Sequence, residues 1–311
     1  MPKSPWLQAP TALGYFQALV ADDATLPLTE AALALAQDEH PQLDVQAALA
    51  EIDGVGARLR RRLPRDASSL HRLRLLNHFF FQELGFALNP NDYYDPDNSF
   101  LHRVLATRRG IPISLAVLYL ELAQQAGLRA FGVSFPGHFL VKLRVQGGGQ
   151  SGEVVIDPAD GRSLSREDLE ERLQPYKRRH GLLGDFDIPL GLFLQAATPR
   201  EVLARMLRNL KEIHRSAADW PRLHAVTERL VLLLPDLPEE RRDRALVRAE
   251  LGLHEEAVGD LAHYLAERPD APDREALARG RPRPGRCRAG ASPGSRSPRS
   301  AWRCCGGCRR C

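Results

Sequence analysis

A histidine and an aspartate on two successive predicted strands are the residues of this chain best suited to chemistry. His138 opens the segment HFLVKLRV, and Asp157 ends the segment EVVID. If a two-residue turn at Gly147 and Gly148 joins the segments, His138 lies opposite Asp157 with their Cβ atoms about 5 Å apart. The glycine-rich loop also allows other registers. An aspartate that orients a histidine is the arrangement that activates a hydroxyl or thiol nucleophile.

The nucleophile of such a site is expected at the N-terminus of a buried helix. There the helix dipole and the free N–H groups favour a thiolate and an oxyanion. The most apolar segment, IPISLAVLYLELAQQAG, predicts this helix, with Pro112 in its first turn and Gly127 just beyond its end. Ser114 is the hydroxyl nearest the helix start. It either attacks a substrate with His138 as its base or satisfies free N–H groups of the first turn.

His138 and Asp157 also have interpretations without catalysis. His138 is then an exposed histidine and Asp157 a turn residue in the segment DPADG. Alternatively, the two side chains form a polar pair that ties two strands together. The sequence leaves these alternatives open.

All five cysteines lie in the last twenty-five residues, between Cys287 and Cys311. A thiol nucleophile is therefore excluded from Met1–Arg286. The segment 280–311 also holds nine arginines and no Asp, Glu or Lys, so subtracting nine from the net charge of +4 leaves −5 for the rest. A nucleic-acid-binding surface is not expected on the folded part. The tail itself is expected to be disordered, and its C-x-x-C spacing does not predict a zinc site without a fold around it.

Other motifs carry less chemistry. The segment DYYDPDNSF resembles a calcium loop but lacks the central glycine and the final glutamate, so its polar residues are expected in turns and a helix cap. No HExxH motif is present, and no metal or cofactor is expected. No apolar run is long enough to span a membrane, and the first residues lack the apolar region of a signal peptide. A cytoplasmic protein without membrane contact is expected.

The hydrophobic pattern changes along the chain from helical to strand periodicity. Residues 15–63 follow a helical pattern, with Thr29 and Asp44 as expected N-caps. A further helix is expected to end near Gly85. After Gly127 the period changes to two in AFGVSF, HFLVKLRV and EVVID. Helices followed by a small antiparallel sheet predict an α+β fold.

A weak internal repeat follows in the C-terminal helical part. Pro235 and Pro269 lie 34 residues apart. The same offset relates three apolar pairs, Leu223 and Ala257, Leu230 and Tyr264, and Val231 and Leu265. Thirty-four residues is the tetratricopeptide period, and generic helical hairpins are the alternative.

The run RRGIPISLAVLYLELAQQAGL, followed by FPGHFLVKL and VVIDPADG, resembles the transglutaminase-like superfamily. With the loop NDYYDPDNSF and the helical repeat, residues 10–275 resemble the bacterial SirB-type transglutaminase-like proteins with a tetratricopeptide region. The resemblance implies that His138 and Asp157 match the catalytic histidine and aspartate of the superfamily. It places the cysteine position of catalytic relatives on Pro112, which has neither a nucleophile nor a backbone N–H.

We therefore expect a transglutaminase-like, papain-like core with flanking helices. The expected domains are an N-terminal helical segment (1–68), the core (69–192), a tetratricopeptide-like region (196–272) and a disordered tail (279–311). The function expected is that of a non-catalytic scaffold that binds a protein or peptide. The alternative is a hydrolase or acyltransferase that uses Ser114, His138 and Asp157.

Overall fold

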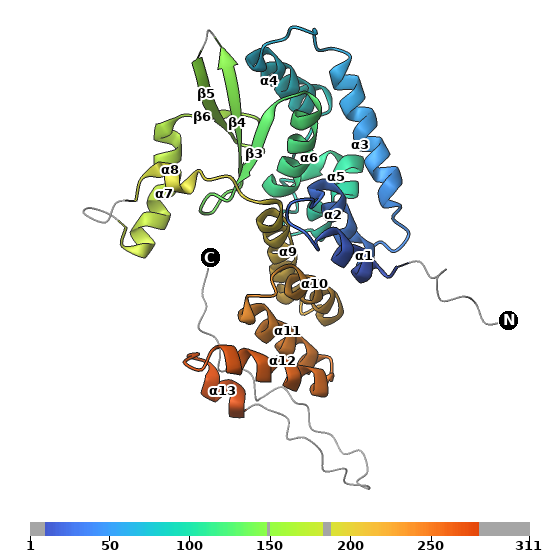
Figure 1. Ribbon diagram of the computed structural model, residues 1–311, viewed down its shortest axis with the longest axis vertical. Helices are drawn as coiled ribbons and strands as arrows, with labels where there is room; N and C mark the ends of the chain where they lie inside the picture. The colour runs from blue at the N-terminus through green and yellow to red at the C-terminus, as the bar shows by residue number, and fades with distance from the viewer. Residues whose placement is uncertain (1–9, 148–149, 183–187, 280–311) are drawn as a thin grey trace, which may run out of the picture. The chain divides into compact units, whose positions relative to one another are not determined.

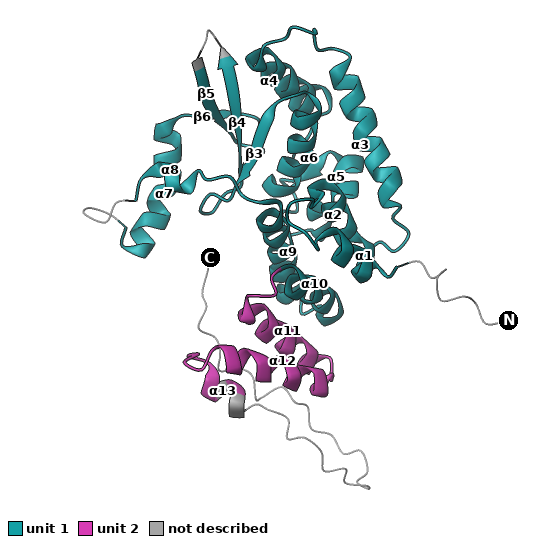
Figure 2. Ribbon diagram, in the orientation of Figure 1, with its two compact units in different colours: residues 1–233 teal, residues 234–311 magenta. Residues whose placement is uncertain are grey.

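The computed structural model describes residues 10–147, 150–182 and 188–279. The chain divides into two compact units, Met1–Leu233 and Leu234–Cys311 (Figure 2). The division falls within the tetratricopeptide-like region expected at 196–272, and the expected domain limits stay predictions. The predictions for the arginine- and cysteine-rich tail lie outside the described residues.

The first unit begins with a layer of helices that pack on one another and on the later core. One predicted N-cap is confirmed, because the Asp44 side chain accepts the backbone N–H of Ala47. The other is wrong: Thr29 lies inside its helix, and its hydroxyl donates to Glu121 at 2.7 Å. The predicted stop at Gly85 agrees with its left-handed φ of 70°. The elements are α1 (Ala12–Leu19), α2 (Leu28–Ala34), η2 (Leu35–Asp38), α3 (Val45–Arg60), α4 (Ser69–Asn77) and the π-helical η3 (His78–Glu83).

The centre of this unit is the apolar helix α6, which runs from Pro112 to Gln125. Nine of its fourteen residues are buried, as the continuous apolar pattern predicts. Pro112 occupies the first helical position and Gly127, at φ 75°, follows the end, so both predicted boundaries are confirmed. The elements that lead into it are β1 (Ala87–Leu88), η4 (Pro96–Ser99), α5 (Leu101–Thr107) and β2 (Arg109–Gly110), of which β1 and β2 pair in parallel.

An antiparallel sheet follows α6, with the strand order β3-β4-β5-β6. Helices α4 and α6 pack on this sheet from one side, and α7 and α8 lie on the other (Figure 1). Because strand side chains alternate, Leu140 joins a core with Leu173 of α7, while Val141 and Leu143 face α6. The elements are β3 (Arg129–Val133), β4 (Leu140–Gly147), β5 (Gln150–Ile156), β6 (Ser163–Leu164), α7 (Arg166–His180) and α8 (Leu190–Phe193).

The remaining helices confirm the 34-residue repeat. Helices α10 (Trp220–Leu233) and α12 (His254–Glu267) each span 14 residues and begin 34 positions apart. All six residues of the three predicted apolar pairs are buried. The other helices are α9 (Pro199–Ser216) in the first unit and α11 (Pro238–Glu250) and α13 (Arg274–Arg279) in the second. Within the described ranges, none of the helices is both long and apolar enough to cross a membrane.

Candidate functional site

His138 lies in the turn that joins β3 to β4. The chain leaves β3 at Val133, and Gly137 takes the left-handed φ of 74° that the turn requires. The His138 N–H donates to the carbonyl of Phe135 at 3.0 Å, and β4 begins only at Leu140. The prediction that the strand starts at His138 is therefore wrong by two residues. Its position in a turn leaves His138 exposed to solvent at the end of the sheet.

Asp157 lies directly after β5 and is held by its own turn and by α7. One carboxylate oxygen, Oδ1, accepts the N–H of Ala159 at 2.9 Å. The other, Oδ2, accepts from the guanidinium of Arg172 at 2.7 Å. Both side chains are mostly buried, with 14% of Asp157 and 21% of Arg172 exposed. Arg172 is thus the direct partner of Asp157.

The pairing register of β4 and β5 is not the one that a turn at Gly147 and Gly148 would give, and it is one of the other registers that the glycine-rich loop allows. Val141 pairs with Ile156 and Gly147 with Gln150. Leu140 instead of His138 therefore lies level with Asp157. A shift of two residues keeps every side chain on its predicted face of the sheet. No hydrogen bond joins His138 to Asp157 in the part of the chain that the structure describes.

Charges around His138 favour its neutral form. Partial burial of the ring lowers the pKa of His138 below its ordinary value, and the Arg172 guanidinium lowers it further. The Asp157 carboxylate opposes this shift, and Arg205 of α9 adds to it. His138 and Asp157 are therefore close enough to interact electrostatically, and the imidazole is neutral at neutral pH. A neutral imidazole can accept a proton or a hydrogen bond from a ligand.

Replacing Arg172 with glutamine should raise the pKa of His138. The substitution removes the guanidinium that lowers the His138 pKa more than Arg205 does, and it leaves Asp157 without its cation, so the protonated imidazole becomes more favourable. The pKa is measured from the ¹⁵N and ¹H shifts of the imidazole in a pH titration. Arg166→Gln is the control, because Arg166 lies on the same helix but is 75% exposed and pairs with Glu170. An unchanged His138 pKa in Arg172→Gln would contradict the electrostatic assignment.

Ser114 lies in the first turn of α6, and its hydroxyl is used within the fold. The side chain is completely buried. Its Oγ donates to the carbonyl of Asn98 at 2.6 Å and accepts the N–H of Ile111 at 3.1 Å. These bonds tie the N-terminus of α6 to η4 and satisfy a free N–H group, which is the structural role weighed for Ser114. No hydrogen bond joins Ser114 to His138 among the described residues.

Pro112 is half-buried at the very start of α6. It presents no nucleophilic atom and no N–H group. The helix start thus has a proline in its first position and a completely buried serine two residues later.

Arg172 and Arg205 are the residues of this region that sequence reasoning missed. The Arg205 guanidinium lies 5.6 Å from the centre of the Phe139 ring, and burial lowers its pKa. It also donates to the carbonyl of Phe135 at 3.4 Å. Both arginines come from later helices, and neither stands in a local motif. Only a signal that relates distant positions, such as covariation, could have found them.

The polar loop before α5 has the structural role that was expected. Asp95 caps η4 by accepting the N–H of Asp97 at 2.9 Å. The Asn98 side-chain amide donates to the carbonyl of Asp92 at 2.6 Å, so it bonds to the segment that precedes η4. Across residues 10–147, 150–182 and 188–279, no group of three His, Cys, Asp or Glu side chains is arranged to hold a metal ion.

Comparison with known proteins relates the chain to a superfamily. A model described as the Transglutaminase-like superfamily matches residues 46–208, and a tetratricopeptide-repeat model matches residues 210–280. A UPF0162 protein of Xylella fastidiosa is 39% identical over 245 residues, which cover 78% of this chain and 85% of that protein. A UPF0162 protein of Vibrio cholerae is 27% identical over 256 residues, covering 82% of this chain and 92% of that protein.

A shorter similarity extends to eukaryotes. F-box only protein 21 of Mus musculus is 43% identical over 70 residues, which are 22% of this chain and 11% of that protein. No solved structure gave a significant match. The superfamily match covers more than half of the chain and includes Pro112, Ser114, His138 and Asp157. The predicted superfamily, the α+β fold and the repeat region are therefore confirmed. The chain belongs to the transglutaminase-like superfamily and is a member of the UPF0162 protein family.

Proposed function

We propose that this protein is a non-catalytic member of its superfamily that binds a protein or peptide partner. The partner would contact the exposed His138 and the surface beside the Asp157–Arg172 pair, and it would also contact the helical repeat. Binding without turnover requires a site that keeps its recognition groups and lacks a nucleophile.

The observation that carries the proposal is the chemistry at the start of α6. Pro112 offers no nucleophile, and the Ser114 hydroxyl is buried and bonded to Asn98 and Ile111. A nucleophile must instead reach both its base and the substrate. By contrast, His138 is exposed and carries a neutral ring beside an ordered ion pair, so it can still contribute hydrogen bonds to a ligand.

The repeat region supports the choice of a protein or peptide as the partner. Repeats of paired helices build extended surfaces that bind other chains. The match to a tetratricopeptide model and the regular offset of α10 and α12 place this chain among proteins of that architecture.

The proposal is tested by quantitative affinity purification of the full chain. We expect at least one specific partner that the parent protein recovers and that His138→Ala or Leu253→Ser loses at least tenfold. Leu253 is chosen because it is an exposed apolar residue of the repeat. Arg166→Ala is the control on an exposed residue of α7 and should recover the partner fully. Recovery of no specific partner that either test variant loses would overturn the proposal.

The hydrolase alternative makes a distinct prediction with the same protein. A fluorophosphonate probe would label Ser114 and would fail to label Ser114→Ala. The tryptic peptide 110–129 contains Ser114 as its only serine, so mass spectrometry identifies the labelled residue without ambiguity. We expect no labelling of this peptide in the folded protein. Labelling there would contradict the non-catalytic proposal.

A further inference from the structure

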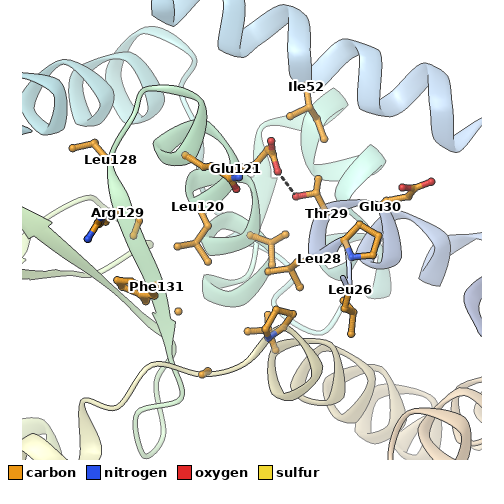
Figure 3. Close-up of a pocket in the computed structure, with 18 of the residues that line it drawn as sticks. Leu26, Leu28, Thr29, Glu30, Ile52, Leu120, Glu121, Leu128, Arg129 and Phe131 are labelled. Carbon is orange, nitrogen blue, oxygen red and sulfur yellow. Dashed lines mark hydrogen bonds between the residues drawn. The ribbon is translucent and has the colours of Figure 1, made fainter. Parts of the chain in front are cut away.

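A second candidate surface lies beside β3, apart from the region of His138. It is a pocket of about 810 Å³ between β3, α2, α3 and α6 (Figure 3). Helix α6 contributes residues from Val117 to Gln124, which belong to its later part, and none of the residues assigned to the candidate site lines the pocket. The close-up shows Arg129 and Phe131 on the β3 side, with Leu28 and Glu30 of α2 across from them.

The pocket runs along the edge of β3. Four consecutive residues of this strand, Arg129 to Gly132, line it. Successive strand side chains point to opposite faces of a sheet, so a cavity that touches all four must follow the strand's edge. The strand order places β3 at the end of the sheet, with β4 on its other side.

The edge of β3 also has backbone groups that point toward the pocket. The Gly132 carbonyl accepts the N–H of Ala197 at 2.8 Å, which shows that the polar groups of Gly132 point away from β4. In an antiparallel pair, residues two apart point their N–H and C=O groups in the same direction. The N–H and C=O of Ala130 therefore point outward as well. Among the described residues, no backbone group bonds to Ala130 on that side. An outward donor and acceptor on an edge strand form a template for another strand.

The side of the pocket formed by α2, α3 and α6, called the helical wall below, combines apolar side chains with charged ones. Its apolar residues include Leu28, Leu49 and Leu120. The same wall carries three carboxylates, and none of them forms an ion pair with a Lys, Arg or His of the described residues. They are Glu30, Asp53 and Glu121.

The three carboxylates are held by neutral groups. The Glu121 carboxylate accepts from Thr29 at 2.7 Å, and Asp53 accepts from the Gln125 amide at 2.9 Å. Glu30 accepts from the Gln46 amide at 2.9 Å. These bonds order the carboxylates without neutralising them, so the helical wall favours a cation. On the strand side, Arg129 is exposed and pairs with no carboxylate of the described chain.

We propose that β3 binds an extended segment of a partner protein as an added strand. The segment would bond to the N–H and C=O of Ala130 and place an apolar side chain between Leu28 and Leu120. A Lys or Arg two residues away would lie on the same face of the segment and reach the carboxylates of the helical wall. This site does not depend on the proposed role of His138.

The proposal is tested by selecting random nonapeptides displayed on phage against the full chain. We expect enriched sequences with an apolar residue and a Lys or Arg two positions away. A synthetic peptide of that sequence should bind the parent protein in a fluorescence anisotropy titration. Ala130→Pro should lower the affinity for this peptide at least tenfold because proline has no N–H to donate to it. The fold should be kept, since the lost N–H points outward and proline is tolerated on edge strands. Ala130→Gly keeps that N–H and is the matched control.

Two further variants separate the possible causes of a weaker interaction. Glu121→Lys should weaken binding of the selected peptide. The same variant should bind more tightly a second peptide in which the Lys or Arg is replaced by Glu, and a folding defect cannot produce that gain. His138→Ala should bind the peptide as the parent does, so failure of the His138 proposal leaves this result unchanged. In hydrogen exchange, the peptide should protect the β3 amides of Ala130 and Gly132 and leave α12 unprotected.

Three outcomes would overturn the proposal. One is that the phage selection enriches no peptide on the parent protein relative to Leu120→Asp, the variant that places a charge in the apolar part of the pocket. Another is unchanged affinity in an Ala130→Pro protein that melts at the parent's temperature, because the pocket would then bind without strand pairing. The third is a dimer in solution that Ala130→Pro dissociates, which would assign the edge to a second copy of this chain.

Discussion

Arg229→Ala is expected to lower the free energy of unfolding by about 3–5 kcal/mol, the range for breaking a buried ion pair. Arg229 lies on α10 and is only 1% exposed. Its guanidinium pairs with Asp38 of η2 and lies 5.4 Å from the centre of the Phe16 ring on α1. Truncation leaves the partly buried Asp38 carboxylate without its cation and opens a cavity beside Phe16. Both effects weaken the attachment of α10 to the N-terminal helices.

The measurement is thermal or denaturant unfolding of the full chain, followed by circular dichroism. For a unit of this size, the loss corresponds to a decrease in Tm of about 10 °C. Arg222→Ala is the matched control on the same helix. Arg222 is 54% exposed, and its ion pairs with Glu39 and Asp219 are worth about 1 kcal/mol or less. Equal stability of the two variants would show that the buried pair does not anchor α10.

Pro112→Cys is expected to create an unusually reactive thiol, with alkylation about tenfold faster than at an ordinary cysteine. The first turn of a helix favours a thiolate and lowers the thiol pKa. Pro112 is half-buried and has no backbone N–H, so its replacement breaks no hydrogen bond of its own. The neighbouring N–H of Ile111 keeps its bond to Ser114. If this position corresponds to the cysteine of catalytic relatives, the new thiol should also depend on His138.

The rate is measured with iodoacetamide at pH 6.5 and read by mass spectrometry on the tryptic peptide 110–129. This readout separates the new thiol from the cysteines at 287–311. Gln124→Cys provides the control, because it lies in the same peptide near the opposite end of α6 and is exposed. Adding His138→Ala to Pro112→Cys should slow the reaction. If Pro112→Cys reacts no faster than Gln124→Cys, the assignment of the nucleophile position to Pro112 is refuted.

Much of the fold could be predicted from local signals. Pro112 and Gly127 mark the ends of α6 because their backbone preferences suit a helix start and the residue after a helix end. The 34-residue offset predicted the equivalence of α10 and α12, since each repeat must bury the same apolar face. Thr29 failed as an N-cap because a tertiary partner, Glu121, binds its hydroxyl inside the helix.

The candidate site could be predicted only in part. Its residue types and their order along the chain were visible, but the register of β4 and β5 depends on a loop that permits several pairings. A register shifted by two keeps the hydrophobic pattern intact, so the pattern could not reject it. The actual pairing moves Leu140 beside Asp157. Sequence reasoning could not reveal that Arg172 would bind the carboxylate.

The sequence by itself determined the fold class, the order of the elements and the absence of a thiol from Met1–Arg286. These properties follow from periodicity and composition, which are local or summed along the chain. Only the tertiary structure decided that the Ser114 hydroxyl bonds to Asn98 and Ile111 and that Asp157 pairs with Arg172. Those choices depend on which groups from distant segments meet, and on which pairing leaves the fewest buried polar groups unsatisfied.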